Sequence, residues 1–70
     1  MDAAKTGALI AQARKEKYLT QGQLAQRLHV SVQAVSKWER GRNFPDLALL
    51  EPLAEALELT VSELLAGERG

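Results

Sequence analysis

Residues 20–41 (TQGQLAQRLHVSVQAVSKWERG) limit the possible folds of this chain more than any other stretch. They contain two helix-start signals: Thr20, which is followed three residues later by a glutamine as in a capping box, and Ser31. These signals predict two short helices, over about 21–28 and 32–40, with only three residues between them. A connection that short forces the two helices to cross steeply, at roughly 90–120°.

The apolar residues of both predicted helices follow the helical period. In the first helix, Leu24, Ala25 and Leu28 share one face. In the second, Val35 and Trp38 do the same. Because Trp38 falls in phase with Val35, we expect it in the core rather than stacked on a base.

This stretch resembles the helix-turn-helix of the phage repressor/Cro family, also called the xenobiotic-response-element type of bacterial regulator. The residues that carry the resemblance are Thr20, Gln21, Leu24, Ala25, Leu28, Val30, Ser31, Val35 and the run SKWERG at 36–41. The resemblance extends from about Gly7 to Leu65. It implies an all-α fold: a five-helix bundle of the lambda-repressor-like DNA-binding type, with the helix-turn-helix at helices 2 and 3.

The length and composition allow one small domain. We expect it to span 1–70, with a core from about 6 to 66 and frayed ends. The chain is 46% hydrophobic but has only one Trp, one Tyr and one Phe, so its core must be mostly Leu, Val and Ala. It has no Cys, which fits a reducing cytoplasm, and no apolar run as long as the ~18 residues of a membrane span.

Charge is distributed unevenly along the chain, although the formal net charge is zero. Residues 1–43 carry eight Lys and Arg against three Asp and Glu, whereas residues 44–70 carry one against six. A molecule polarised in this way can present a positive surface to phosphate. The alternative is that these charges are solvated helix faces of mixed sign.

The predicted second helix, 32–40, is the candidate recognition helix. A helix in the major groove contacts base edges mainly from its N-terminal half. Gln33 can pair with adenine N6 and N7, Lys37 can donate to guanine O6 and N7, and Val32 can meet a thymine methyl. The resemblance implies the same base-reading positions, and Ser36 shares their face. The alternative is an ordinary solvated helix surface.

Phosphate contacts should flank the recognition helix. Gln21 opens the preceding helix, where free N–H groups and the helix dipole favour an anion, and the resemblance implies this use. The other candidates are Ser31, Arg40, Arg42 and Asn43. Such contacts fix the register on the duplex without specifying its sequence.

The resemblance also implies an ion pair between Arg14 and Glu39 beneath the recognition helix. The alternative is an exposed Arg14 that contacts a phosphate. Two residues, Tyr18 and His29, stand where the family prefers Gly. We expect His29 in a left-handed conformation. For Tyr18 we expect a different helix end, with the ring packed over the surface or reaching a phosphate.

Three further helices are predicted, over about 6–17, 47–58 and 61–66. Asp46 should cap the second of these, with Leu47 in its core stripe. Pro52 conflicts with a regular helix there, so either the first turn is irregular or the helix begins nearer Leu50. The last helix opens with a capping box at Thr60, and the chain after it should be loose.

These features predict sequence-specific binding of double-stranded DNA by a bacterial or phage transcription regulator in the cytoplasm. One copy would read only three or four base edges, so we expect a homodimer on an inverted repeat with half-sites about 34 Å apart. Helices 4 and 5 are the candidate dimer elements, with Leu65, Leu53 or Leu49 exposed. A longer regulator could carry a further C-terminal effector domain.

The main alternative function is an antitoxin that binds a toxin protein and its own promoter. An enzyme is not expected, because the chain shows no carboxylate pair with a base, no phosphate loop and no set of metal ligands. His29 is the only histidine, which argues against a metal site. We therefore expect no cofactor.

Overall fold

The computed structural model describes residues 1–70 and contains helices only. The elements are α1 (Ala3–Glu16), α2 (Gln21–Leu28), α3 (Val32–Glu39), the 3₁₀ helix η1 (Leu47–Leu49), α4 (Leu50–Leu57) and α5 (Val61–Ala66). This confirms the predicted all-α class with five α-helices. None of the helices has the length and hydrophobicity that crossing a bilayer requires.

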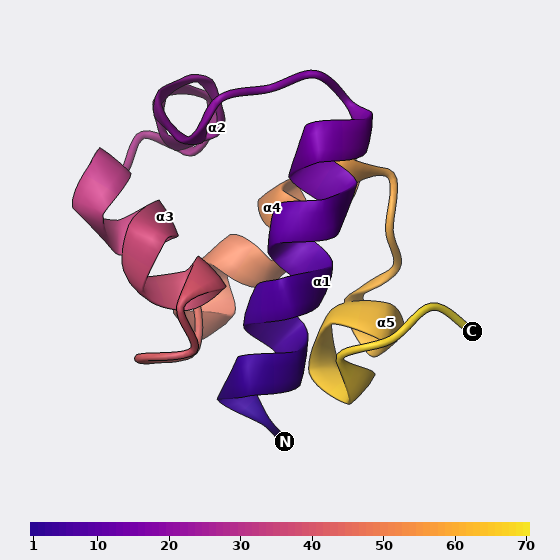
Figure 1. Ribbon diagram of the computed structural model, residues 1–70. Helices are drawn as coiled ribbons and strands as arrows, with labels where there is room; N and C mark the ends of the chain where they lie inside the picture. Colours follow the sequence, from indigo (N-terminus) through magenta and orange to yellow (C-terminus); the bar gives the residue numbers. More distant parts are fainter.

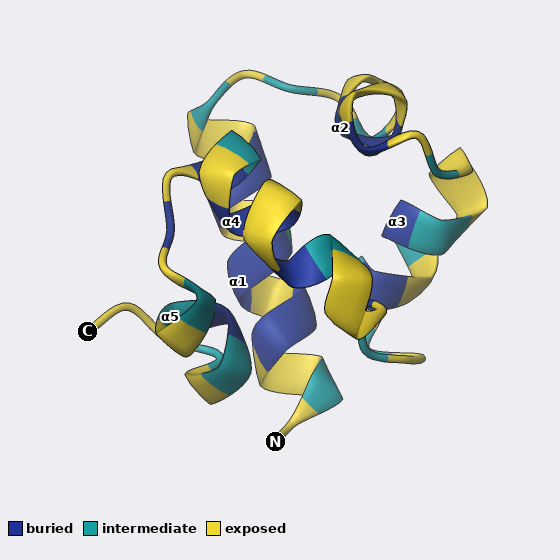
Figure 2. Ribbon diagram, turned by 180° about the vertical axis from the view of Figure 1, so that it is seen from behind, coloured by how far each residue is buried: buried dark blue, intermediate teal, exposed yellow.

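Helix α1 is the centre of the arrangement, with α3 on one side of it and α5 on the other (Figure 1). The core contains 14 buried hydrophobic residues, and the helices turn these positions inward (Figure 2). Ile10 of α1, Leu24 of α2, Val35 of α3 and Leu53 of α4 are completely buried. A core built mainly of Leu, Val and Ala side chains agrees with the composition.

Local hydrogen bonds begin the helices where the sequence predicts them. Thr20 Oγ1 accepts from the Gln23 N–H at 3.0 Å, and Gln23 Oε1 accepts from the Thr20 N–H at 2.9 Å. The same reciprocal capping box opens α5 at Thr60. Ser31 Oγ accepts from the Ala34 N–H at 3.1 Å and caps α3. Three of the four predicted caps, at Thr20, Ser31 and Thr60, are therefore confirmed, and α2 and α5 have the predicted bounds.

Three residues other than glycine adopt a left-handed backbone: Tyr18, His29 and Glu58. His29 has φ 57°, which confirms the expectation for the turn between α2 and α3. For Tyr18, the expected different helix end is wrong, because the residue also has φ 57°, the conformation that a glycine would adopt there. Its side chain is 93% exposed, so the ring does not pack over the surface, and the phosphate contact stays a prediction.

Replacing Tyr18 with glycine should stabilise the domain. The left-handed conformation costs an L-residue about 1–2 kcal/mol. Glycine avoids this cost, but it loses more conformational entropy on folding, which offsets part of the gain. We expect a gain of about 0.5–1 kcal/mol, seen as a rise of a few degrees in the midpoint of thermal unfolding. Gly41→Ala is the opposing control, because Gly41 has φ 70° and an added Cβ would lie 2.9 Å from Ala4 Cα. A lower midpoint for Tyr18→Gly would contradict the expected strain.

The start of α1 differs from the prediction. The predicted helix begins at Thr6 after a frayed end, whereas α1 begins at Ala3. Asp2 is its N-cap: Oδ1 accepts from the N–H of Ala4 at 2.9 Å and of Lys5 at 3.2 Å. The extra turn follows from this cap, which is a standard helix-start signal.

The region around Pro52 confirms the expected start of the α-helix near Leu50 and differs from the prediction at Asp46, Leu47 and Leu53. A 3₁₀ turn over Leu47–Leu49 precedes α4, so Pro52 is the third residue of the α-helix. A proline costs little there, because the first N–H groups of a helix have no partner within it. The Asp46 side chain makes no capping hydrogen bond. Leu47 is 80% exposed and Leu53 completely buried, which reverses the predicted roles of these two leucines.

The prediction that the chain after α5 is loose was wrong, because its residues bond to the rest of the chain. Glu68 pairs with Lys5 Nζ at 2.9 Å, Arg69 pairs with Glu16 at 2.5 Å, and the Gly70 N–H donates to Glu63 at 2.9 Å. These bonds hold the pKa of Glu16, Glu63 and Glu68 below the ordinary carboxyl value. The partners lie more than 50 residues apart for both ion pairs, so no local pattern indicates them.

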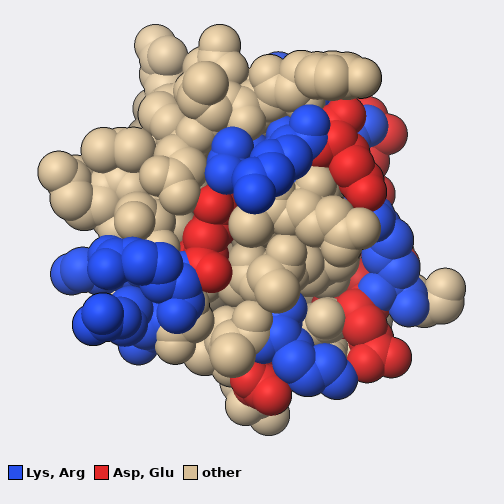
Figure 3. All heavy atoms as spheres, viewed as in Figure 1, with Lys and Arg blue, Asp and Glu red and all other residues tan.

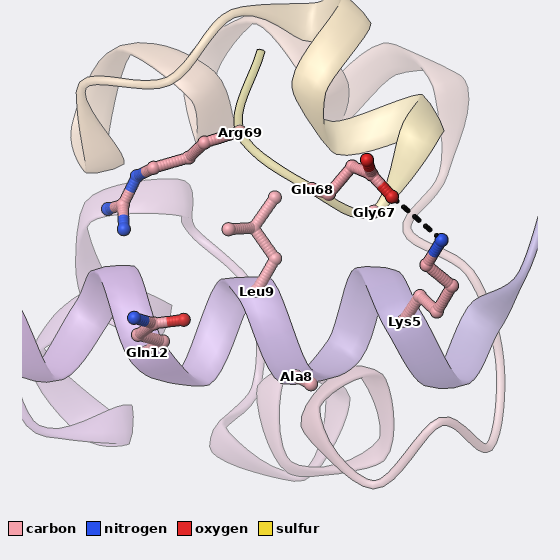
Figure 4. Close-up of a pocket in the computed structure, with 7 residues that line it drawn as sticks. All are labelled: Lys5, Ala8, Leu9, Gln12, Gly67, Glu68 and Arg69. Carbon is pink, nitrogen blue, oxygen red and sulfur yellow. Dashed lines mark hydrogen bonds and ion pairs between the residues drawn. The ribbon is translucent and has the colours of Figure 1, made fainter.

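A shallow groove of about 400 Å³ separates this C-terminal segment from α1 (Figure 4). It is lined by Lys5, Ala8, Leu9, Gln12, Gly67, Glu68 and Arg69. Leu9 projects from α1 toward the segment, and the Lys5–Glu68 ion pair crosses the groove beside it. Helix α3 lies on the other side of α1, so this groove is separate from the helix-turn-helix surface.

Candidate nucleic-acid interface

The outer face of α3, defined as Val32, Gln33, Ser36 and Lys37, is directed away from the core. Its opposite face holds Val35 and Trp38, which are 0% and 4% exposed. These buried positions confirm that Trp38 is a core residue. Val32, Gln33 and Lys37 are exposed, whereas Ser36 is half-buried. Three of the four predicted base-contact side chains are therefore open to solvent on one helix.

The ion pair implied for Arg14 and Glu39 is present beneath α3. Arg14 Nε donates to Glu39 Oε2 at 2.6 Å, and Arg14 Nη2 donates to Oε1 at 3.0 Å. The two side chains are only 11% and 7% exposed. The bond to Glu39 raises the pKa of Arg14 against the opposing effect of burial. Arg14 is thus not the exposed phosphate contact of the alternative expectation.

The carboxylate of Glu39 also binds the helix before α3. Gln21 Nε2 donates to Glu39 Oε1 at 2.9 Å, so one side chain joins α1, α2 and α3. Gln21 was expected only as a phosphate contact, and its bond to Glu39 has no local signal, because it links residues 18 positions apart. A side-chain amide has two N–H groups, so one remains for another acceptor. The first backbone N–H groups of α2, at Gln21 and Gly22, also lack a partner within the helix.

Two glycines set how closely α3 approaches α1. A Cβ on Gly7 would lie 2.1 Å from the carbonyl oxygen of Trp38, and a Cβ on Gly41 would lie 2.9 Å from Ala4 Cα. Both neighbours are backbone atoms, which cannot move aside as a flexible side chain could. The end of α3 therefore rests directly on the backbone of α1.

The predicted phosphate contacts flank the outer face of α3. Ser31 precedes the helix and is exposed, while Arg40, Arg42 and Asn43 follow it and are also exposed. Arg40 Nε bends back to the carbonyl oxygen of Ser36 at 3.3 Å. Lys and Arg atoms gather over the end of α3 in Figure 3, where no Asp or Glu atoms are interspersed among them.

Ion pairs within the chain neutralise some of its cations and leave others unpaired. Lys5, Arg14, Lys17 and Arg69 each pair with a carboxylate. Lys37, Arg40 and Arg42 form no ion pair, so the charge at α3 and the following loop is not neutralised within the chain. Six of the nine acidic residues lie instead in residues 46–70, which follow α3 in the chain. This arrangement favours an anionic partner along α3.

Comparison with known proteins agrees with this geometry. The family model described as Helix-turn-helix (HTH_3) matches residues 10–64. The chain is 44% identical over 59 residues to the HTH-type transcriptional activator BcrR of Enterococcus faecalis, covering 84% of this chain and 29% of that protein. It is 40% identical over 62 residues to the immunity repressor protein of Bacillus phage phi105, covering 89% and 43%. The chain thus spans less than half the length of these two relatives.

A solved structure gives the same result for the fold. The restriction-modification controller protein C.AhdI of Aeromonas hydrophila superposes with a TM-score of 0.81 at 32% sequence identity. The match covers 90% of this chain and 96% of that one. The lambda-repressor-like arrangement implied by the sequence is therefore confirmed.

Proposed function

Since the chain belongs to the Cro/C1-type helix-turn-helix family, we propose that it binds a specific sequence of double-stranded DNA for a bacterial or phage transcription regulator. Helix α3 enters the major groove with its outer face against the base edges. The observation that carries this proposal is the exposed polar face of α3, held outward by the buried Val35 and Trp38. The site of action is the cytoplasm, where such DNA is found.

Base readout is assigned to the N-terminal half of α3. Gln33 pairs with an adenine through its amide, and Lys37 donates to a guanine one helical turn later. Val32, which is 41% exposed, meets a thymine methyl. Ser36 is half-buried on the same face and can reach a base edge only at close approach.

Phosphate contacts hold the helix in register. On one side of the groove, Gln21 and Ser31 present N–H and hydroxyl groups at the starts of α2 and α3. On the other side, the side chains of Arg40, Arg42 and Asn43 contact the sugar-phosphate backbone of the DNA. The bond from Gln21 to Glu39 supports this role, because it fixes the amide before DNA arrives.

Two copies bind an inverted repeat. A single α3 reads few base pairs, and half-sites about 34 Å apart allow two copies to lie on the same side of the duplex. The relatives named as an activator and a repressor support a role in transcription control.

Gln33→Ala and Arg42→Ala separate base readout from phosphate contact. Gln33→Ala should weaken specific binding by about 1–3 kcal/mol and relax the preference at one base pair. Arg42→Ala should weaken binding to all sequences alike and lower the salt slope by about one unit. Fluorescence anisotropy on a duplex enriched from a random pool, and on a scrambled duplex, measures both effects. Equal losses on the two duplexes for both variants would refute this assignment of roles.

A further inference from the structure

Val32 is an apolar side chain on the otherwise polar outer face of α3. It is the first residue of the helix, and it is 41% exposed. Val30 packs against the hydrophobic core and Val35 is part of that core, whereas Val32 does neither. The isopropyl group of Val32 therefore has no packing role in the core, and it is free to contact an apolar group of a bound partner.

The major groove offers such a side chain only one kind of apolar group. Base edges there present hydrogen-bond donors, hydrogen-bond acceptors and the C5 methyl of thymine. 5-Methylcytosine carries a methyl group on the same ring carbon, whereas uracil and unmodified cytosine carry none. A valine on the reading face thus favours a pyrimidine with a C5 methyl over one without it.

Gln33, the next residue, is also free to bind. The side-chain amides of Gln21 and Gln23 are held by hydrogen bonds with Glu39 and Thr20, whereas no hydrogen bond within the chain engages the amide of Gln33. Pairing with adenine uses both polar atoms of that amide, because Oε1 accepts from the N6 amino group and Nε2 donates to N7.

Methylation of adenine at N6 removes one half of this pairing. In a base pair, one N6 hydrogen bonds to thymine and the other points into the major groove. A methyl group on N6 must take the groove position, because the remaining hydrogen is needed for the base pair. The methyl group then replaces the hydrogen that Gln33 Oε1 would accept, and it fills the space of that contact.

We propose that the outer face of α3 reads base methylation with opposite sign at two adjacent residues: Val32 selects a pyrimidine with a C5 methyl, and Gln33 rejects N6-methyladenine. This inference rests on the proposed DNA binding and names a way in which that binding is regulated. Methylation of the adenine releases the protein from its site. A C5 methyl on cytosine supplies the same contact to Val32 as the methyl of thymine.

The first test replaces thymines by uracil, one at a time, in a duplex enriched from a random DNA pool. One replacement in each half-site should weaken binding of the wild-type chain about three- to fivefold, the contribution of one buried methyl group. Val32→Ser should bind the thymine and uracil duplexes within about twofold of each other. At the same position, 5-methylcytosine should bind the wild-type chain more tightly than cytosine by about the same three- to fivefold factor.

The second test replaces adenines of the same duplex by N6-methyladenine, one at a time. One replacement should weaken binding of the wild-type chain about tenfold or more, because a bidentate pair is lost. Gln33→Ala has no such pair to lose, so it should bind the methylated and unmethylated duplexes within about twofold of each other. Each variant is the matched control for the other: Val32→Ser should stay sensitive to N6-methyladenine, and Gln33→Ala to uracil.

The outcomes separate the two proposals. Failure of the wild-type chain to enrich any sequence from the pool would overturn the proposed function itself. Specific binding without a uracil effect that Val32→Ser removes, or without an N6-methyl effect that Gln33→Ala removes, would overturn only the reading of methylation. Both side chains are exposed, so the two variants should keep the thermal midpoint of the wild-type chain.

Discussion

Gly7→Ala is expected to lower the free energy of unfolding by at least about 3 kcal/mol, which a domain of this size can barely tolerate. The added Cβ would lie 2.1 Å from the carbonyl oxygen of Trp38 and 3.2 Å from the carbonyl carbon of Glu39. Both atoms belong to the backbone of α3, so the clash can be relieved only by separating α3 from α1. That movement would also uncover Trp38, which is 4% exposed. Urea unfolding followed by tryptophan fluorescence measures the loss.

Gly22→Ala is the matched control for Gly7→Ala. Gly22 also lies in a helix, but an added Cβ would meet only Thr20 Oγ1, at 3.8 Å. The substitution should therefore stabilise α2 by up to about 1 kcal/mol through helix propensity. Equal unfolding free energies for the two alanine variants would show that α1 and α3 are not in backbone contact.

Glu39→Ala is expected to cost about 3–5 kcal/mol of unfolding free energy. The substitution leaves the guanidinium of Arg14 buried without its counter-charge and removes the acceptor of Gln21 Nε2. The loss would reflect the unpaired buried charge more than the net worth of the pair, since a buried ion pair contributes little beyond the desolvation it offsets. Chemical unfolding of the variant provides the measurement.

Glu68→Ala is the control for that experiment. Glu68 pairs with Lys5 at 2.9 Å, but the two side chains are 67% and 52% exposed. Water and salt screen such a pair, so its removal should leave the unfolding free energy almost unchanged. A Glu39→Ala loss no larger than the Glu68→Ala loss would mean that burial does not govern the Arg14–Glu39 pair.

Those parts of the fold that depend on neighbouring residues could be predicted from the sequence. The caps at Thr20, Ser31 and Thr60 act within three residues, so their patterns place the starts of α2, α3 and α5. The phase of Val35 and Trp38 likewise indicates which side of α3 is buried. Asp2 carries a signal of the same local kind, although the predicted helix begins later.

Features that join distant segments could not be predicted in this way. The bond between Gln21 and Glu39 and the ion pairs of the C-terminal segment depend on how the helices pack. The exposure of Leu47 depends on the 3₁₀ turn, which rotates it out of the stripe that a regular helix would bury. The resemblance in sequence begins at about Gly7, but the contact with the Trp38 backbone that requires glycine there is not visible in the sequence.

The most direct test of DNA binding by α3 is a titration of the ¹⁵N-labelled chain with a duplex enriched from a random pool. The side-chain amide of Gln33 and the backbone amides of Val32 and Lys37 should show the largest shifts, while α5 stays nearly unchanged. Shifts that spare α3 and gather elsewhere, or no shifts at all with the enriched duplex, would contradict the assignment of this face to the major groove.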